Sequence, residues 1–194
     1  MSEMLSTRDR IIAAAEARMR DGGYHGFSFR EVAADVGIKS ASVHHHFPAK
    51  EDLASAVVDG YTERFIATLG DPTDQGQTPT ALINRYVELF RRALIDEKRM
   101  CLCGLLGSET RALPDRVSAD TRTFFHRHIA WLSKVFRTDA PHESQAAIED
   151  KAMRFVAALE GALLVAQSLG DADVFERIVG STMATLDLGG SELN

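Results

Sequence analysis

The residues best suited to chemistry gather in a short stretch between positions 28 and 50. They combine hydroxyl, imidazole and cationic side chains: Ser28, Arg30, Ser40, Ser42, His44, His45 and Lys50. Serine and histidine can hydrogen-bond to the edges of bases, whereas arginine and lysine bind phosphates. The mixture therefore indicates contact with a nucleic acid, if the chain holds these side chains on one surface.

The first of these residues fits the start of a short helix. Ser28 is a good N-cap, and Glu31 completes a capping box, so a helix is predicted over Phe29–Val36. Gly37 then suits the left-handed residue that ends such a helix.

A second short helix is predicted to start with Ser40 as its N-cap and to run to about Phe47, before Pro48 stops it. Two helices this short cannot form a core by themselves. The apolar stripe of a helix over Arg8–Arg20 supplies a third partner. This is the layout of a helix-turn-helix, in which the second short helix lies in the major groove.

The stretch from about Leu5 to Phe65 resembles the tetracycline-repressor (TetR) family. The resemblance rests on the apolar spacing, the Gly-aromatic-x-Gly approach, the VAADVGIK turn and the HHFPAKEDL ending. It implies an all-α fold with a helix-turn-helix DNA-binding domain at 5–65 (motif 28–47) and a larger helical domain at 66–194 for ligand sensing and dimerisation. It also implies a homodimeric repressor of a palindromic double-stranded DNA operator, with the last two helices of each subunit forming the dimer interface.

The chemistry assigns a role to each polar residue of the motif. Ser28 and Arg30 stand at a helix start that favours phosphate, and Lys50 opens the next helix as a phosphate-binding point charge. Ser40, Ser42, His44 and His45 lie on the expected recognition helix, where serine can contact phosphate or a base edge and His45 can donate or accept at a base. Family members usually carry tyrosine where this chain has His44, so its reach to phosphate is shorter. Capping alone is the alternative for Ser28 and Ser40.

Helical periodicity continues through the rest of the chain, beyond a turn-rich stretch at Gly70–Pro79. Eight or nine helices are expected in all, the later ones near Lys50–Leu69, Thr80–Ile95, Arg99–Ala112, Asp115–Arg137, His142–Leu169 and Ala172–Leu188.

The segment RMCLCGLLGSE at 99–109 places Cys101 and Cys103 beside two basic residues, where a helix is expected to begin. Such cysteines can have a lowered pKa and sense electrophiles or oxidants, as in some similar family members. The alternative is that both are small core residues. A zinc site with His126 and His128 is not expected, because residues two apart on a helix point to opposite sides. The run of histidines at 44–46 fans out around its helix for the same reason, so no metal is expected.

An effector pocket would need apolar walls with a few polar groups. Aromatic and imidazole side chains that suit this description are Tyr86, Phe90, Phe125, His128 and Trp131. The same residues would equally suit an ordinary core.

Composition fits a packed protein of 194 residues, 45% of them hydrophobic. The longest apolar run, Phe155–Leu164, is broken by Glu160, and the N-terminus lacks the apolar core of a secretion signal. We therefore expect a cytoplasmic protein with no membrane partner. The net charge of −6 comes from residues after position 50, and DNA binding needs only a local basic footprint.

An enzyme is not expected, because the chain has no Gly-rich phosphate loop, nucleophile elbow or carboxylate pair with an evident role. No cofactor is expected either. Two alternatives to a repressor released by a small molecule or electrophile remain open. One is a DNA-binding regulator or activator that senses nothing, and the other is a thiol-based redox sensor with no reversible ligand.

Overall fold

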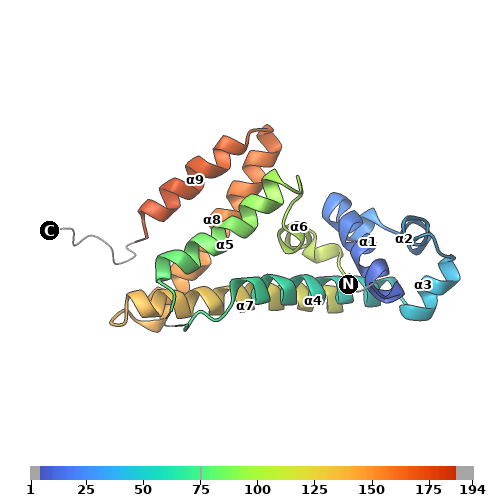
Figure 1. Ribbon diagram of the computed structural model, residues 1–194, viewed down its shortest axis with the longest axis horizontal. Coiled ribbons are helices and arrows are strands. Elements are labelled where there is room, and N and C mark those ends of the chain that lie inside the picture. Colours follow the sequence, from blue (N-terminus) through green and yellow to red (C-terminus); the bar gives the residue numbers. More distant parts are fainter. Residues whose placement is uncertain (1–4, 75, 187–194) are drawn as a thin grey trace. The chain divides into compact units, whose positions relative to one another are not determined.

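The structure is a computed structural model that describes residues 5–74 and 76–186. Within these ranges all regular secondary structure is helical, so the predicted all-α fold is confirmed (Figure 1). The elements are α1 (Thr7–Gly22), η1 (Tyr24–Gly26), α2 (Phe29–Val36), α3 (Ser40–His46), α4 (Lys50–Leu69), α5 (Pro79–Ile95), α6 (Leu102–Ser108), η2 (Thr110–Ala112), α7 (Asp115–Asp139), α8 (Gln145–Leu169) and α9 (Ala172–Ala184).

The helix predicted over Arg99–Ala112 is wrong in length. Lys98 has a positive φ of 51°, and the Arg99 N–H donates to the Ala93 carbonyl to close the end of α5. The chain therefore reaches residue 101 in irregular backbone, and α6 covers only Leu102–Ser108 before η2. The start expected at His142 is three residues early, because Ser144 caps α8. The end expected at Leu188 is too late, because α9 ends at Ala184 with Thr185 as its C-cap.

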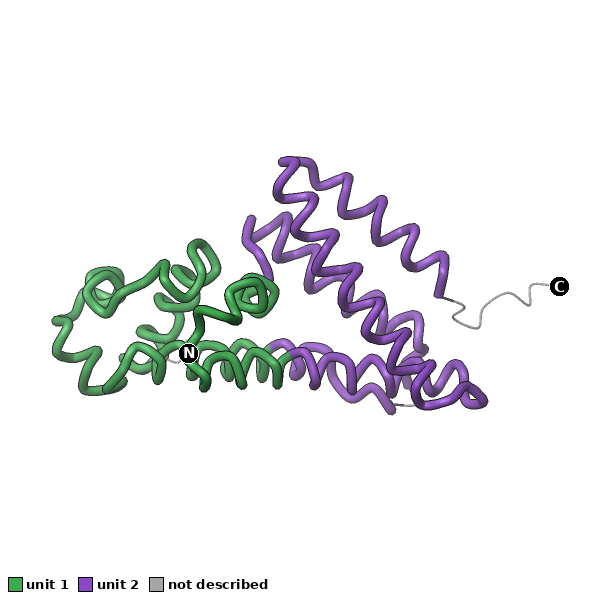
Figure 2. The backbone as a smooth tube through the Cα atoms, turned by 180° about the vertical axis from the view of Figure 1, so that it is seen from behind, with its two compact units in different colours: residues 1–64, 102–124 green, residues 65–101, 125–194 purple. Residues whose placement is uncertain are grey.

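The chain forms two compact units, coloured separately in Figure 2. Unit 1 comprises residues 1–64 and 102–124, and unit 2 comprises 65–101 and 125–194. Two long helices, α4 and α7, contribute to both. These units are defined by packing, and they differ from the expected functional domains at 5–65 and 66–194 because segment 102–124 packs with the N-terminal helices.

Unit 1 is built on α1, which packs against α2 while α2 packs against α3. Its buried residues are mostly apolar, and they include Ile11, Met19, Val32, Val43, Phe47 and Val57. Segment 102–124 joins this unit through polar links to α4. The Ser55 hydroxyl donates to Asp120 at 2.5 Å, and Arg116 donates to Asp52 at 2.7 Å.

Unit 2 centres on α8, which packs against α5 and α9 (Figure 1). By length and composition, α8 is the one helix among the described residues that is apolar enough to cross a membrane. The expectation from the sequence rested on the run Phe155–Leu164, which is too short to span a membrane, whereas the longer helix passes because this criterion tolerates a few charged residues. The helix buries a full face, including Phe155, Leu159 and Leu163, against its neighbours. A core helix of a soluble protein has the same composition, so this finding is weak evidence for a membrane.

Candidate nucleic-acid interface and buried polar cluster

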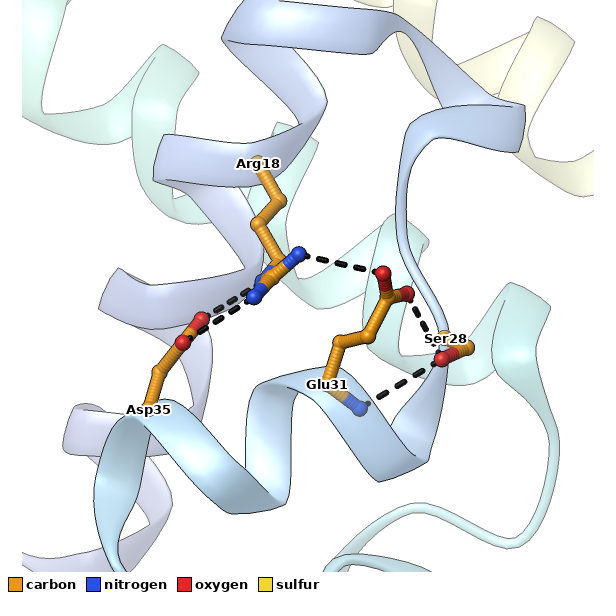
Figure 3. Close-up of polar contacts among 4 residues, drawn as sticks. All are labelled: Arg18, Ser28, Glu31 and Asp35. Carbon is orange, nitrogen blue, oxygen red and sulfur yellow. Dashed lines mark hydrogen bonds and ion pairs between the residues drawn. The ribbon is translucent and has the colours of Figure 1, made fainter.

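The start of α2 is fixed by a network of hydrogen bonds and ion pairs (Figure 3). The Ser28 hydroxyl accepts from the Glu31 N–H at 3.4 Å and donates to the Glu31 carboxylate at 2.7 Å. Arg18 of α1 contacts Glu31 at 3.3 Å and forms a paired contact with Asp35, at 2.5 and 3.0 Å. These partners lower the pKa of Glu31, chiefly through the Ser28 hydroxyl, and that of Asp35, chiefly through Arg18.

This network confirms the predicted capping box and shows what Ser28 does locally. Its hydroxyl is engaged by Glu31, so the side chain orients α2 rather than projecting freely toward a ligand. Arg30 lies in the same first turn of α2 and is exposed.

The turn between α2 and α3 has the predicted left-handed glycine. Gly37 has φ 74° and ψ 36°, and the Ile38 N–H donates to the Ala33 carbonyl at 2.9 Å. The remaining carbonyl at Val36 accepts from Arg10 of α1 at 2.5 Å. Because the end of α2 is closed in this way, the direction in which α3 leaves it is determined.

The prediction that Ser40 caps α3 is wrong. The N-cap is Lys39, in extended backbone with φ −76° and ψ 144°, and no side chain makes the capping hydrogen bond. Ser40 is instead the first helical residue and is half-buried. Lys39 is an exposed cation at the start of α3, and the sequence analysis did not single it out. The position of Lys39 between Gly37 and the serine-rich helix could have indicated this role from the sequence.

The helix α3 has one buried and one exposed face. Val43 is fully buried and Phe47 nearly so, whereas His44 and His45 are exposed and Ser42 is half-buried. The His44 ring packs edge-on against Phe29, with centroids 4.6 Å apart. The exposed imidazole of His45 therefore extends from a helix whose opposite face is anchored in the core.

Lys50 is half-buried at the start of α4 rather than a free surface charge. Its ammonium lies 4.7 Å from the ring centre of Tyr24 and 4.5 Å from that of Phe27, within cation–π range of both. Burial lowers the pKa of Lys50.

Four of the predicted sensing residues, Tyr86, Phe90, His128 and Trp131, lie together in the core of unit 2. The Tyr86 hydroxyl and His128 Nδ1 are 2.8 Å apart, and both side chains are fully buried. Trp131 stacks on Tyr86 and donates its indole N–H to the Gly70 carbonyl at 2.8 Å. Phe90 stacks on Tyr86, with ring centroids 5.5 Å apart, and meets Phe65 edge-on. Phe125 is half-buried on α7.

The sequence reasoning missed Glu160 as a member of this cluster. Both of its carboxylate oxygens are buried. Burial raises the pKa of Glu160 to about 7, and a hydrogen bond from the Cys101 thiol opposes part of that rise. Burial also raises the pKa of Tyr86, with Glu160 and Cys101 adding to the effect. The sequence did point to this residue, because Glu160 interrupts the longest apolar run of the chain and a buried carboxylate is costly without a compensating role.

Both cysteines are buried, with 1% of Cys101 and none of Cys103 exposed. Burial favours the reading as core residues over that as reactive thiols, because a thiolate sensor needs access and stabilised charge. His126 and His128 lie in the continuous helix α7, the first exposed and the second buried. Among the described residues, no three His, Cys, Asp or Glu side chains are arranged to hold a metal ion.

Comparison with known proteins decides the family. The family model for bacterial regulatory proteins of the tetR family matches residues 11–57. The crystal structure of a TetR transcriptional regulator from Legionella pneumophila is 31% identical with a TM-score of 0.89, and the match covers 96% of this chain and 100% of that one. The chain belongs to the tetR family. Another tetR-family regulator, from Agrobacterium tumefaciens, is 29% identical with a TM-score of 0.85 over 92% of this chain and 96% of its own.

Curated relatives within the tetR family match over a shorter stretch. The HTH-type transcriptional regulator UidR of Escherichia coli is 30% identical over 92 residues, which is 47% of each chain. The HTH-type transcriptional repressor KstR2 of Mycobacterium tuberculosis is 28% identical over 74 residues, 38% of this chain and 37% of its own. The match thus spans about half the length of the first of these relatives, and less of the second.

Proposed function

We propose that the chain is a DNA-binding transcriptional repressor that acts as a homodimer on a palindromic double-stranded operator. The observation that carries this proposal is the exposed face of α3, with His44 and His45, on a helix fixed by the capped α2 and its glycine turn. Family membership and the repressor among its relatives support it. Residues 5–65 would bind DNA, and residues 66–194 would sense and dimerise.

Contacts to DNA divide by chemistry. We assign base edges to His45 and His44, with Ser40 and Ser42 beside them, because imidazole and hydroxyl groups can donate or accept at bases. Arg30 and Lys50 bind phosphates, which set the register of the protein on the duplex. Ser28 contributes by capping α2 and presenting its first-turn N–H groups.

A second copy of the chain would cover an exposed apolar stripe on α8. The stripe comprises Met153, Leu164, Val165 and Leu169, which are 41–66% exposed. Large side chains this exposed on one helix face mark an interaction surface. A dimer also solves the problem that one recognition helix reads too few bases.

The effector site is proposed at the buried cluster in unit 2. Tyr86, His128 and Glu160 supply polar groups, and Phe90, Trp131 and Phe125 supply apolar walls. A small molecule that binds better to the state with mis-spaced recognition helices would release the operator. Such a regulator acts in the cytoplasm, where its DNA is.

The experiment is a titration of purified protein on duplex DNA from the region upstream of its own gene, against a scrambled duplex of equal composition. Tight binding to the first alone supports the repressor, and equal binding to both contradicts it. Small apolar compounds and electrophiles are then added to the complex. If an electrophile still releases DNA from a variant that carries both Cys101→Ala and Cys103→Ala, a thiol sensor is excluded.

A further inference from the structure

Glu109 reaches across the sequence to the chain that precedes the helix-turn-helix. It follows α6 directly and is half-buried. Its carboxylate accepts a hydrogen bond from the backbone N–H of Tyr24 at 2.9 Å, a contact between residues 85 positions apart. Both residues belong to unit 1.

The backbone around Tyr24 is shaped to receive this carboxylate. Gly23 has φ 68° and ψ −166°, a conformation that is essentially restricted to glycine. A Cβ atom added there would lie 2.0 Å from a carboxylate oxygen of Glu109. The close approach of Glu109 therefore requires glycine at position 23 on two independent grounds.

The residue that Glu109 holds is half of an aromatic pair. Tyr24 and Phe27 meet edge-on with ring centres 6.2 Å apart, and their side chains are 8% and 2% exposed. The Lys50 ammonium lies within 5 Å of both ring centres, at 4.7 and 4.5 Å. The position of the ammonium is thus defined by two rings, one of which is carried by the backbone that Glu109 fixes.

We propose that Glu109 is a positioning residue for DNA binding, which holds Tyr24 so that the Tyr24–Phe27 pair presents the Lys50 ammonium to a phosphate. The proposal rests on the phosphate-binding role proposed for Lys50. It links segment 102–124, through Tyr24, to the side chain proposed to bind phosphate. A shift of that segment by the length of one hydrogen bond would loosen the ammonium without any change in α3.

The effect of Glu109 operates through its hydrogen bond rather than its charge. The carboxylate that acts electrostatically on Lys50 is Glu31. An amide oxygen accepts the same hydrogen bond from Tyr24, so Glu109→Gln is a matched control that removes only the charge. Glu109→Ala removes the acceptor, and Glu109→Asp withdraws it by one methylene.

The test measures affinity for a fluorescently labelled random-sequence duplex over a range of NaCl concentrations. The full-length variants are Glu109→Ala, Glu109→Asp, Glu109→Gln, Lys50→Ala and the double variant Glu109→Ala with Lys50→Ala. We expect Glu109→Ala and Glu109→Asp to weaken binding about 2- to 10-fold, the size of one lost hydrogen bond. Glu109→Gln should bind like the parent, and the double variant should bind like Lys50→Ala alone.

Non-additivity separates positioning from a general structural role. If the losses of Glu109→Ala and Lys50→Ala multiply in the double variant, Glu109 does not act through Lys50 and the proposal is overturned. If Lys50→Ala itself changes nothing, the phosphate contact under "Proposed function" fails instead, and the two failures are distinguishable.

Proton NMR provides a readout that needs no DNA. The ε-methylene protons of Lys50 should be shifted upfield by the two rings in the parent and in Glu109→Gln. In Glu109→Asp, and in Glu109→Ala if it folds by circular dichroism, the shift should move toward that of a free lysine. An unchanged shift in Glu109→Asp would overturn the proposal.

Discussion

The helix-turn-helix and the buried cluster of unit 2 use polar residues in opposite ways. In the first, Ser28 pairs with Glu31 and Asp35 pairs with Arg18 of α1, both near the surface, and His44 and His45 of α3 are exposed. In the second, Tyr86 and His128 come from helices far apart in sequence and meet in a solvent-free core. One region is built to display polar groups, and the other to enclose them.

The pKa of a carboxyl group differs in direction between the two regions. Hydrogen bonding lowers the pKa of the Glu31 carboxyl at the surface, whereas burial raises that of Glu160 to about 7. Burial likewise lowers the pKa of His128 to about 3, so the imidazole is neutral in the folded protein at neutral pH. The difference indicates that the first region works with fixed charges, whereas the second holds groups whose charge depends on what surrounds them.

The largest expected effect comes from charging the exposed stripe on α8. Leu164→Glu should dissociate the proposed dimer and weaken operator binding more than about 100-fold, because both half-sites are needed together. Analytical ultracentrifugation and DNA titration measure the two effects. Ala81→Glu adds a charge at an exposed position of α5 and should change neither. A dimeric Leu164→Glu protein would place the interface elsewhere.

The cost of burying a carboxyl should appear in the pH dependence of stability. The folded-state pKa of Glu160 is about 7 against an ordinary value of 4.5, so the folded protein holds a proton between these pH values that the unfolded chain has lost. Stability is therefore lost as pH rises through this window. Glu160→Gln should be more stable than the parent by on the order of 3 kcal/mol near pH 8, and by much less near pH 5.

Thermal unfolding at both pH values checks the prediction for Glu160. A shift in melting temperature of roughly 6–12 °C corresponds to that free energy for a chain of this size. The Glu149→Gln variant, at an exposed position of the same helix, is the control. Equal stabilisation of Glu160→Gln at both pH values would mean that the carboxyl is not buried in solution.

Substitutions of His45 and Lys50, at the helix-turn-helix, should affect specificity and overall affinity separately. His45→Ala should weaken binding to the operator by about 1–3 kcal/mol while leaving random DNA unaffected. Lys50→Ala should weaken both about equally and reduce the salt slope by about one unit. The roles assigned to these residues are untenable if both variants lose equally on operator and random duplex.

The smallest effect is expected from the capping box. Ser28→Ala should lower the free energy of unfolding by about 1 kcal/mol, because the Glu31 N–H loses its acceptor. Ser40→Ala should have little effect, since Lys39 and not Ser40 is the N-cap. Denaturant titration compares the two, and a loss for Ser40→Ala equal to that for Ser28→Ala would contradict the observed cap.

Local rules predicted the capping box and the turn of the helix-turn-helix because those contacts lie within a few residues. The capping box at Ser28 and the left-handed Gly37 follow from spacing alone, and the structure reproduces both. The N-cap of α3 could not be predicted in this way. Ser40 has the residue type that favours an N-cap, but Lys39 before it takes that position in extended backbone. The fold class was predictable for a similar reason, because helical periodicity is a local property.

The buried cluster of unit 2 could be predicted only in part. Aromatic residues suggested Tyr86, His128 and Trp131 as neighbours, but no spacing rule joins Glu160 of α8 to Cys101 before α6. The Glu109 contact with Tyr24 spans 85 residues and involves a backbone N–H, which carries no sequence signal at all. Contacts of this kind arise from tertiary packing.

The most direct test of the central claim is selection from a random-sequence duplex library with the full-length protein, followed by sequencing. The account predicts enrichment of one palindrome with two half-sites, bound at least about 1000-fold more tightly than random DNA at physiological salt. His45→Ala should relax one position in each half-site. Recovery of no enriched sequence, with binding that depends only on salt, would contradict the claim that this chain is a sequence-specific regulator.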